Sequence, residues 1–203
     1  MKLYYTPGAC SLGPRICLLE AGLPFEGIAV NLKTHTVEAT GADYYAIAPK
    51  GSTPALQLDN GELLTENPVM MQYIADQAGN KLAPAPGTME RYRLHEMLNY
   101  ITSELHKGFW PLYNPATPES FRALVKDKLH GKFAYVDAVL AKTPYLIGQT
   151  LTPADAYLFN ITLWADKPTV QLDLSKYHHL AAFMERMKAR PSVQTAMKAE
   201  GLI

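Results

Sequence analysis

Hydrophobic and polar residues are arranged in two different ways along the chain, and the change falls near residue 80. In the first part, short apolar runs of strand length occur at 2–5, 25–31, 54–58 and 62–65, separated by polar turns. In the second part, apolar residues recur every three to four positions, and no run is typical of a strand. The pattern predicts an α/β region followed by an all-helical region.

The order of the predicted elements defines the topology of the first region. An amphipathic run from 11 to 22 lies between the first two strands, so a β-α-β opening with parallel strands is expected. Asn60-Gly61 joins the last two strands, and such a pair favours a hairpin because both residues tolerate positive φ. A short helix is predicted around 43–47 and a longer one over 69–77.

A segment rich in glycine and proline, residues 79–87, separates the two regions as an interdomain linker would. We therefore predict a first domain over 1–80 and an all-helical C-terminal domain over 88–203. The helices expected in the second domain span 89–109, 118–141, 153–164, 178–189 and 192–200.

Composition narrows the class of protein. The 203 residues include 19 Lys+Arg and 19 Asp+Glu, so no overall field attracts nucleic acid or an acidic membrane surface. Two cysteines are too few for a disulfide framework, and no membrane span or signal peptide is evident, which predicts a cytoplasmic protein. His178-His179 lacks acidic or thiol companions, so no metal is expected. Small-molecule or protein partners fit best.

Cys10 is the first candidate for chemistry. It follows the first strand and opens the first helix, where unpaired N–H groups and the helix dipole favour thiolate over thiol. The alternative is that the cysteine is simply a small buried hydrophobe.

Two further segments of the first domain could bind a ligand. If the Thr53-Pro54 bond is cis, the backbone of Thr53 is left free to pair with a peptide, although a proline at a strand entry can also merely mark an edge. Glu66 and Asn67 precede Pro68 at a helix start, which suits the ammonium and carboxylate of a zwitterion. The alternative reading is an ordinary cap by Asn67.

In the second domain, Asn99, Ser103, His106 and Trp110 fall on one face of an ideal helix. An imidazole beside an aromatic platform suits a binding site, but a polar outer face would show the same stripe, and Trp110 could be core packing. Thr152-Pro153-Ala154-Asp155 approximates a capping box, which is a folding signal and not a catalytic one.

Ordered motifs occur along the whole chain. They are Met1-Lys2-Leu3-Tyr4-Tyr5, Pro7-Gly8-Ala9-Cys10-Ser11, Lys50-Gly51 with Pro54-Ala55-Leu56, Leu64-Thr65-Glu66, Glu104-Leu105-His106-Lys107-Gly108-Phe109 and Ala154-Asp155-Ala156-Tyr157-Leu158-Phe159. Together these motifs resemble those of bacterial beta-class glutathione S-transferases. The resemblance implies a thioredoxin-like N-terminal domain, a helical C-terminal domain and a cytosolic homodimer. Its co-substrate would be glutathione, without a metal.

The resemblance also implies roles for individual residues. Cys10 would lie beside the glutathione sulfur and could form a mixed disulfide with it, with His106 nearby as a hydrogen-bond partner or proton relay. The implied contacts to glutathione are Tyr5, Cys10, Ser11, His35, Thr53, Pro54, Glu66, Asn67, Asn99, Ser103 and His106, with Asn99 reaching across the dimer. The electrophile pocket would be shaped by Phe109, Trp110, Tyr113 and Trp164.

Some positions depart from the family pattern. His35 stands where relatives often have a lysine for the glycyl carboxylate, and Ser52-Thr53 and Asn67-Pro68 replace more usual pairs. Trp110 is larger than usual and would narrow the second-substrate pocket. These departures predict altered glutathione binding.

The resemblance leads to the function of a glutathione transferase that conjugates the glutathione thiolate to hydrophobic electrophiles, as in detoxification. Two alternatives stay open. Cys10 could serve glutathione-dependent thiol–disulfide exchange or a peroxidase side activity. The protein could also be a non-catalytic binder of glutathione or hydrophobic ligands.

Overall fold

The computed structural model describes residues 1–79 and 81–203, and the chain divides into two compact units. Unit 1 comprises Met1–Ala83 together with Arg190–Ile203, and unit 2 comprises Pro84–Ala189. Asn80, which ends the predicted first domain, lies outside the described residues. The last fourteen residues were expected in the helical domain but group with the first unit.

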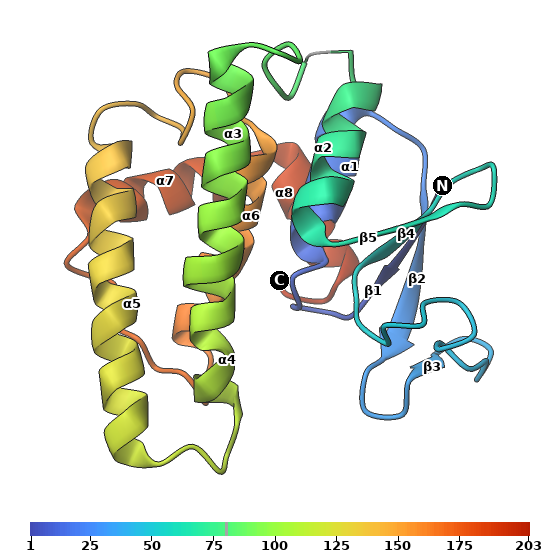
Figure 1. The fold of residues 1–203 in the computed structure, drawn as a ribbon, viewed down its shortest axis with the longest axis horizontal. Coiled ribbons are helices and arrows are strands. Elements are labelled where there is room, and N and C mark those ends of the chain that lie inside the picture. The colour runs from blue at the N-terminus through green and yellow to red at the C-terminus, as the bar shows by residue number, and fades with distance from the viewer. Residues whose placement is uncertain (80) are drawn as a thin grey trace. The chain divides into compact units, whose positions relative to one another are not determined.

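Unit 1 is built on a five-stranded sheet in the order β3-β2-β1-β4-β5 (Figure 1). Its strands are β1 (Lys2–Tyr5), β2 (Glu26–Asn31), β3 (Thr36–Val37), β4 (Ala55–Gln57) and β5 (Leu63–Thr65). β1 pairs with β2 in parallel, and the other pairs are antiparallel, as the β-α-β opening and the hairpin predicted. Only β3, two residues long, was not anticipated.

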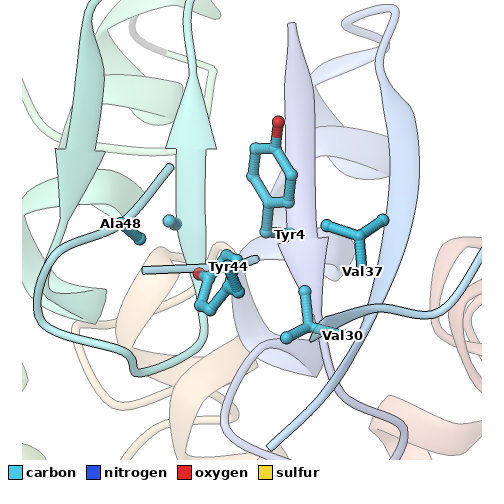
Figure 2. Close-up of a cluster of buried hydrophobic side chains, with 6 residues drawn as sticks. Tyr4, Val30, Val37, Tyr44 and Ala48 are labelled. Carbon is cyan, nitrogen blue, oxygen red and sulfur yellow. The ribbon is translucent and has the colours of Figure 1, made fainter. Parts of the chain in front are cut away.

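Strand β1 has buried side chains on both faces of the sheet. Its neighbouring positions, Leu3 and Tyr4, point to opposite sides, and both are buried. Tyr4 belongs to a cluster with residues of the 37–48 segment, and its ring centroid lies 5.7 Å from that of Tyr44 (Figure 2). Leu3 and its partner Leu56 face the other way and are fully buried as well. The short helix expected around 43–47 is wrong: Ile47 and Ala48 donate to the Tyr44 carbonyl in consecutive turns.

Among the described residues, unit 1 contains the helices α1 (Leu12–Ala21), α2 (Asn67–Gln77) and α8 (Pro191–Ala199). α1 packs against both α2 and α8 (Figure 1). The partner of α8 lies far away in sequence, since Glu200 just after it pairs with Arg15 of α1 at 2.9 Å. Contacts therefore group α8 with unit 1, although it follows the helical region in the sequence.

Unit 2 is helical, as predicted. Its elements are α3 (Met89–Tyr100), a π-helical turn η1 (Ile101–His106), α4 (Lys107–Tyr113), α5 (Glu119–Leu140), α6 (Pro153–Thr162), a 3₁₀ turn η2 (Leu163–Asp166) and α7 (His178–Lys188). Every residue of α6 is buried, so it forms the centre of this unit. The predicted capping box lies at its start, where the Asp155 carboxylate accepts from the Thr152 backbone at 2.8 Å.

The helix expected over 89–109 is interrupted by η1. Within it, Lys107 donates its N–H to the Thr102 carbonyl five residues back, one residue further than in an α-helix. The hydroxyls of Thr102 and Ser103 bind the carbonyls of Leu98 and Asn99, four residues earlier. The extra residue shifts the faces of the helix by about 100° beyond this point.

In the described ranges, every helix is too short or too polar to cross a bilayer.

Candidate functional site

Cys10 lies in the loop between β1 and α1, two residues before the helix begins. Its Sγ lies 3.4 Å from the Thr53 carbonyl oxygen, in donor geometry, and its side chain is partly exposed. Cys17, by contrast, is fully buried within α1, so only that cysteine fits the description of a small core hydrophobe. Both cysteines lie in the described part of the chain, and neither forms a disulfide.

Short polar side chains fix the loop that carries Cys10. The buried Ser11 hydroxyl donates to the Thr6 carbonyl at 3.1 Å and accepts from the Thr6 N–H at 3.3 Å. Thr6 Oγ1 in turn donates to Val30 of β2 and accepts from the Thr53 hydroxyl. Ser11 therefore holds the backbone of the loop, and Thr6, which the sequence analysis did not single out, links the loop to two neighbouring segments.

The Thr53-Pro54 bond is cis, as expected. The Thr53 carbonyl is not free, however, because it accepts a hydrogen bond from the Cys10 thiol. Ser52 also holds a position in this turn, since its carbonyl accepts from the buried Tyr44 hydroxyl at 3.1 Å. Gly51 adopts φ 64°, and a Cβ there would lie 2.4 Å from the ring of Tyr45, so the turn requires glycine.

Glu66 and Asn67 lie at the start of α2 with opposite exposures. Glu66 has φ 69° and forms an exposed ion pair with Lys50 at 2.7 Å. Asn67 is buried and donates its Nδ2 to the Cys10 carbonyl at 2.9 Å, while its Oδ1 is buried without a hydrogen-bond partner. The cap by Asn67 is therefore wrong, since the side chain joins α2 to the Cys10 loop instead.

Tyr5 and His35, two other predicted residues of unit 1, contact different neighbours. Tyr5 packs under the guanidinium of Arg15, 4.1 Å from its ring centroid. His35 adopts φ 53° and stacks on Tyr45 with centroids 4.5 Å apart, and its Nδ1 is buried without a hydrogen-bond partner.

A buried carboxylate near the C-terminus also holds the Cys10 loop, and the sequence analysis missed it. Glu200 accepts from the Gly8 N–H at 3.0 Å and from Arg15 Nε at 2.9 Å. Burial raises the pKa of this carboxyl, while the Gly8 and Arg15 contacts oppose that shift. No sequence signal connects the three residues, because about 190 positions separate the ends of this contact.

In unit 2, His106 is the last residue of η1 and is enclosed by aromatic rings. Its Nδ1 lies 2.6 Å from the Tyr157 hydroxyl of α6, and its ring meets those of Tyr157 and Trp164 edge to face. Burial, helped by the neighbouring Lys107, lowers the pKa of His106 to about 4. The imidazole is therefore neutral at pH 7.

Three of the four predicted pocket aromatics gather around this histidine. Trp164 is buried and packs edge to face against Phe109 at 5.9 Å and Tyr113 at 5.7 Å. Trp110 is separate from them, with 71% of its surface exposed. Burial also raises the pKa of the Tyr113 hydroxyl.

The polar stripe on 99–110 does not form one face. Asn99, Ser103 and Trp110 are exposed, and Ser103 donates to the Asn99 carbonyl, whereas His106 points at α6. The spacing assumed an uninterrupted α-helix, and the π-helical turn changes its register.

Family models for both parts of the chain match this sequence. "Glutathione S-transferase, N-terminal domain" matches residues 8–77, and "Glutathione S-transferase, C-terminal domain" matches residues 100–191. Glutathione S-transferase GstA of Escherichia coli O157:H7 is 48% identical over 203 residues, covering all of both chains. The chain belongs to the glutathione S-transferase family.

Solved structures narrow the class within glutathione S-transferases. A sphingomonad glutathione S-transferase complexed with glutathione is 42% identical with a TM-score of 0.94, and each chain is covered completely. The bacterial beta-class enzyme of Sphingomonas chungbukensis is 43% identical with the same TM-score and complete coverage. The resemblance to the beta class and the thioredoxin-like and helical domains of the glutathione S-transferase fold are thus confirmed.

Proposed function

We propose that this protein is a glutathione transferase that joins the sulfur of glutathione to hydrophobic electrophiles. The observation that carries the proposal is the Cys10 thiol resting on the carbonyl before a cis proline, at the start of α1, in a chain of this family. Two relatives that match over their full length, at 48% and 38% identity, are named as glutathione S-transferases, which favours an enzyme over a non-catalytic binder.

The reaction would proceed by direct displacement. The thiolate of bound glutathione attacks the electrophilic carbon, a carbon–sulfur bond forms, and the leaving group departs with its electron pair. The positive end of the α1 helix dipole favours the thiolate, and holding both substrates together supplies the rest of the acceleration.

Glutathione would contact unit 1 through its backbone and its head group. Thr53 would pair its backbone with the cysteinyl part, beside Pro54, and Glu66 and Asn67 would hold the γ-glutamyl group. The remaining proposed contacts are Tyr5, Cys10, Ser11, His35, Asn99, Ser103 and His106. Because the Cys10 thiol donates to the Thr53 carbonyl here, glutathione would compete with that contact or share the oxygen.

Phe109, Tyr113 and Trp164 would shape the apolar wall for the electrophile, since they pack together around His106. The exposed Trp110 would act at the rim of this pocket and not in its wall.

A second candidate activity is favoured by the exposure of Cys10. A partly exposed thiol at a helix start can attack a mixed disulfide of glutathione, forming a disulfide with glutathione and releasing the other thiol. A second glutathione would then regenerate Cys10 and leave as oxidised glutathione. Replacing Cys10 with alanine separates the activities, because conjugation that persists while disulfide reduction is lost identifies an enzyme with both.

We further propose a cytoplasmic homodimer that acts in detoxification, as the family resemblance implies. Light scattering of the purified protein is expected to give twice the 22.5 kDa chain mass. A monomer at micromolar concentration would contradict the dimer and leave the transferase proposal standing.

Steady-state conjugation of a chloronitrobenzene substrate at several glutathione concentrations tests the main proposal. We expect saturable activity in glutathione and release of chloride in equal amount to product. Tight glutathione binding without turnover would select the non-catalytic binder, and the absence of both binding and turnover would reject the family function for this chain.

A further inference from the structure

Tyr157 holds His106 in a defined orientation from the centre of unit 2. It lies on α6, is fully buried, and places its hydroxyl oxygen 2.6 Å from His106 Nδ1. The two rings stand at 89° with centroids 5.8 Å apart, and Trp164 closes another side of the imidazole at 4.9 Å. Packing against two edge-to-face rings leaves the imidazole little freedom to turn.

The π-helical turn is what brings the imidazole to this hydroxyl. His106 ends η1, whose extra residue changes the helix register, while Ser103 in the same turn stays exposed. Lys132 of α5 binds the turn from outside, donating to the Glu104 carbonyl at 3.0 Å and pairing with its carboxylate at 2.7 Å. Such turns recur at functional sites, and this one is tied down on both sides.

The short contact identifies the donor. A neutral imidazole carries one N–H donor and one acceptor nitrogen. A separation of 2.6 Å is short for an N–H donor but suits an O–H donor, and a phenol is a stronger acid than a neutral imidazole N–H. The distance thus favours the Tyr157 hydroxyl as donor to Nδ1, an arrangement that would leave the ring proton on Nε2.

We propose that Tyr157 is a positioning residue that fixes His106 in the Nε2–H tautomer, so that Nε2 serves as a hydrogen-bond donor and not as a base. This inference rests on the proposed function, and it distinguishes between the two roles considered for His106. A histidine with its proton on Nε2 stabilises a thiolate there and cannot remove a proton through that nitrogen.

Nitrogen-15 NMR of the full protein tests the tautomer without any substrate. The expected spectrum at pH 7 has the proton-bearing shift at Nε2 and the unprotonated shift at Nδ1 of His106. The opposite assignment, or an equal mixture, overturns the proposal even if the enzyme conjugates glutathione. A correct tautomer in a protein without transferase activity would instead defeat the proposed function alone.

Tyr157→Phe tests the link to catalysis, and Tyr177→Phe is the matched control. Tyr177 also bonds a histidine of unit 2, reaching His130 Nδ1 at 3.3 Å and its carbonyl at 2.6 Å, but it is outside the proposed site. We expect Tyr157→Phe to give mixed His106 tautomers and to lower kcat about tenfold with the KM for glutathione within about twofold, and the control to change neither.

A folded Tyr157→Phe variant with unchanged tautomer and unchanged kcat would overturn the proposal. If that variant does not fold, the NMR assignment of the unsubstituted protein still decides it.

Discussion

The two units present their candidate groups in different ways. In unit 1, loops and helix starts fix the backbone around Cys10, through short polar side chains and the buried Glu200 carboxylate. In unit 2, packed aromatic rings of α6 and η2 hold His106. The comparison teaches that hydrogen bonds to the backbone hold the Cys10 loop of unit 1, whereas side-chain packing holds His106 in unit 2. Substitutions should therefore weaken the two units by different physical routes.

The largest expected effect is in unit 1, from Glu200→Ala. Its loss leaves Arg15, which is 5% exposed, without its ion-pair partner, and removes the carboxylate that accepts from the Gly8 N–H. Removing one member of a buried pair costs about 3–5 kcal/mol, and we expect urea unfolding to show a loss of about 4 kcal/mol. Glu185→Ala is the control, because its pair with Lys188 is exposed and should cost under about 1 kcal/mol. Equal losses for both variants would contradict the role of Glu200.

The corresponding change in unit 2 is Trp164→Ala. It removes a buried ring that contacts His106, Phe109 and Tyr113, and a loss of about 3 kcal/mol in unfolding free energy is expected from the cavity. The matched control Trp110→Ala removes a ring that is 71% exposed and should cost under about 0.5 kcal/mol. A smaller cost for Trp164 than for Trp110 would refute the packing account.

Lowering the pH should change the contributions of His106 and Asp155 to the stability of unit 2 in opposite directions. The pKa of His106 is lowered to about 4, so between about pH 6.5 and 4 only the unfolded chain binds this proton, and stability falls as pH falls. Burial raises the pKa of Asp155 to about 6, so there the folded state binds the proton and stability rises as pH falls from about 6 to 4.

His106→Gln and Asp155→Asn test these opposite signs. Compared with the unsubstituted protein, His106→Gln should lose less stability between pH 6.5 and 4, and Asp155→Asn should lose more, each by on the order of 1–2 kcal/mol. Urea unfolding at half-unit pH steps measures both. Curves that remain parallel to that of the unsubstituted protein would rule out the shifted pKa of the substituted group.

The smallest expected effect is from Lys50→Gln. The Lys50–Glu66 pair is exposed on both sides, so its loss should change the unfolding free energy by under about 0.5 kcal/mol, with even less effect in 1 M salt. Thermal unfolding at low and high salt measures this. A loss above 1 kcal/mol would mean that ion pairing, and not the buried Asn67, fixes the start of α2.

The sequence predicted most of the elements, because their signals are local. The β-α-β opening, the hairpin at Asn60-Gly61 and the capping box at Thr152 agree with the structure, since each depends on neighbouring residues. The helix expected around 43–47 failed because tertiary packing holds that segment in turns around the buried Tyr44. The two residues of β3 were too few to produce a recognisable alternation.

The candidate residues divide in the same way. The place of Cys10 at a helix start could be predicted, because a helix terminus depends on neighbouring residues. The sequence allowed a cis bond before Pro54, and the structure decided for it, because an X-Pro bond can adopt either isomer. The contacts of Glu200 with Arg15 and of Tyr157 with His106 could not, since each joins segments far apart in the chain. The turn of His106 away from the exposed Asn99 and Ser103 also escaped prediction, because spacing cannot reveal a π-helical turn.

The sequence by itself therefore determined the α/β and helical regions, the family and the thiol at the start of the first helix, since periodicity, turn chemistry and ordered motifs are written in neighbouring residues. Only the tertiary structure decided that the last helix packs on the first unit, that Asn67 binds the Cys10 carbonyl and that Tyr157 meets His106. Those outcomes depend on which distant groups share a buried space, where each polar atom needs a partner.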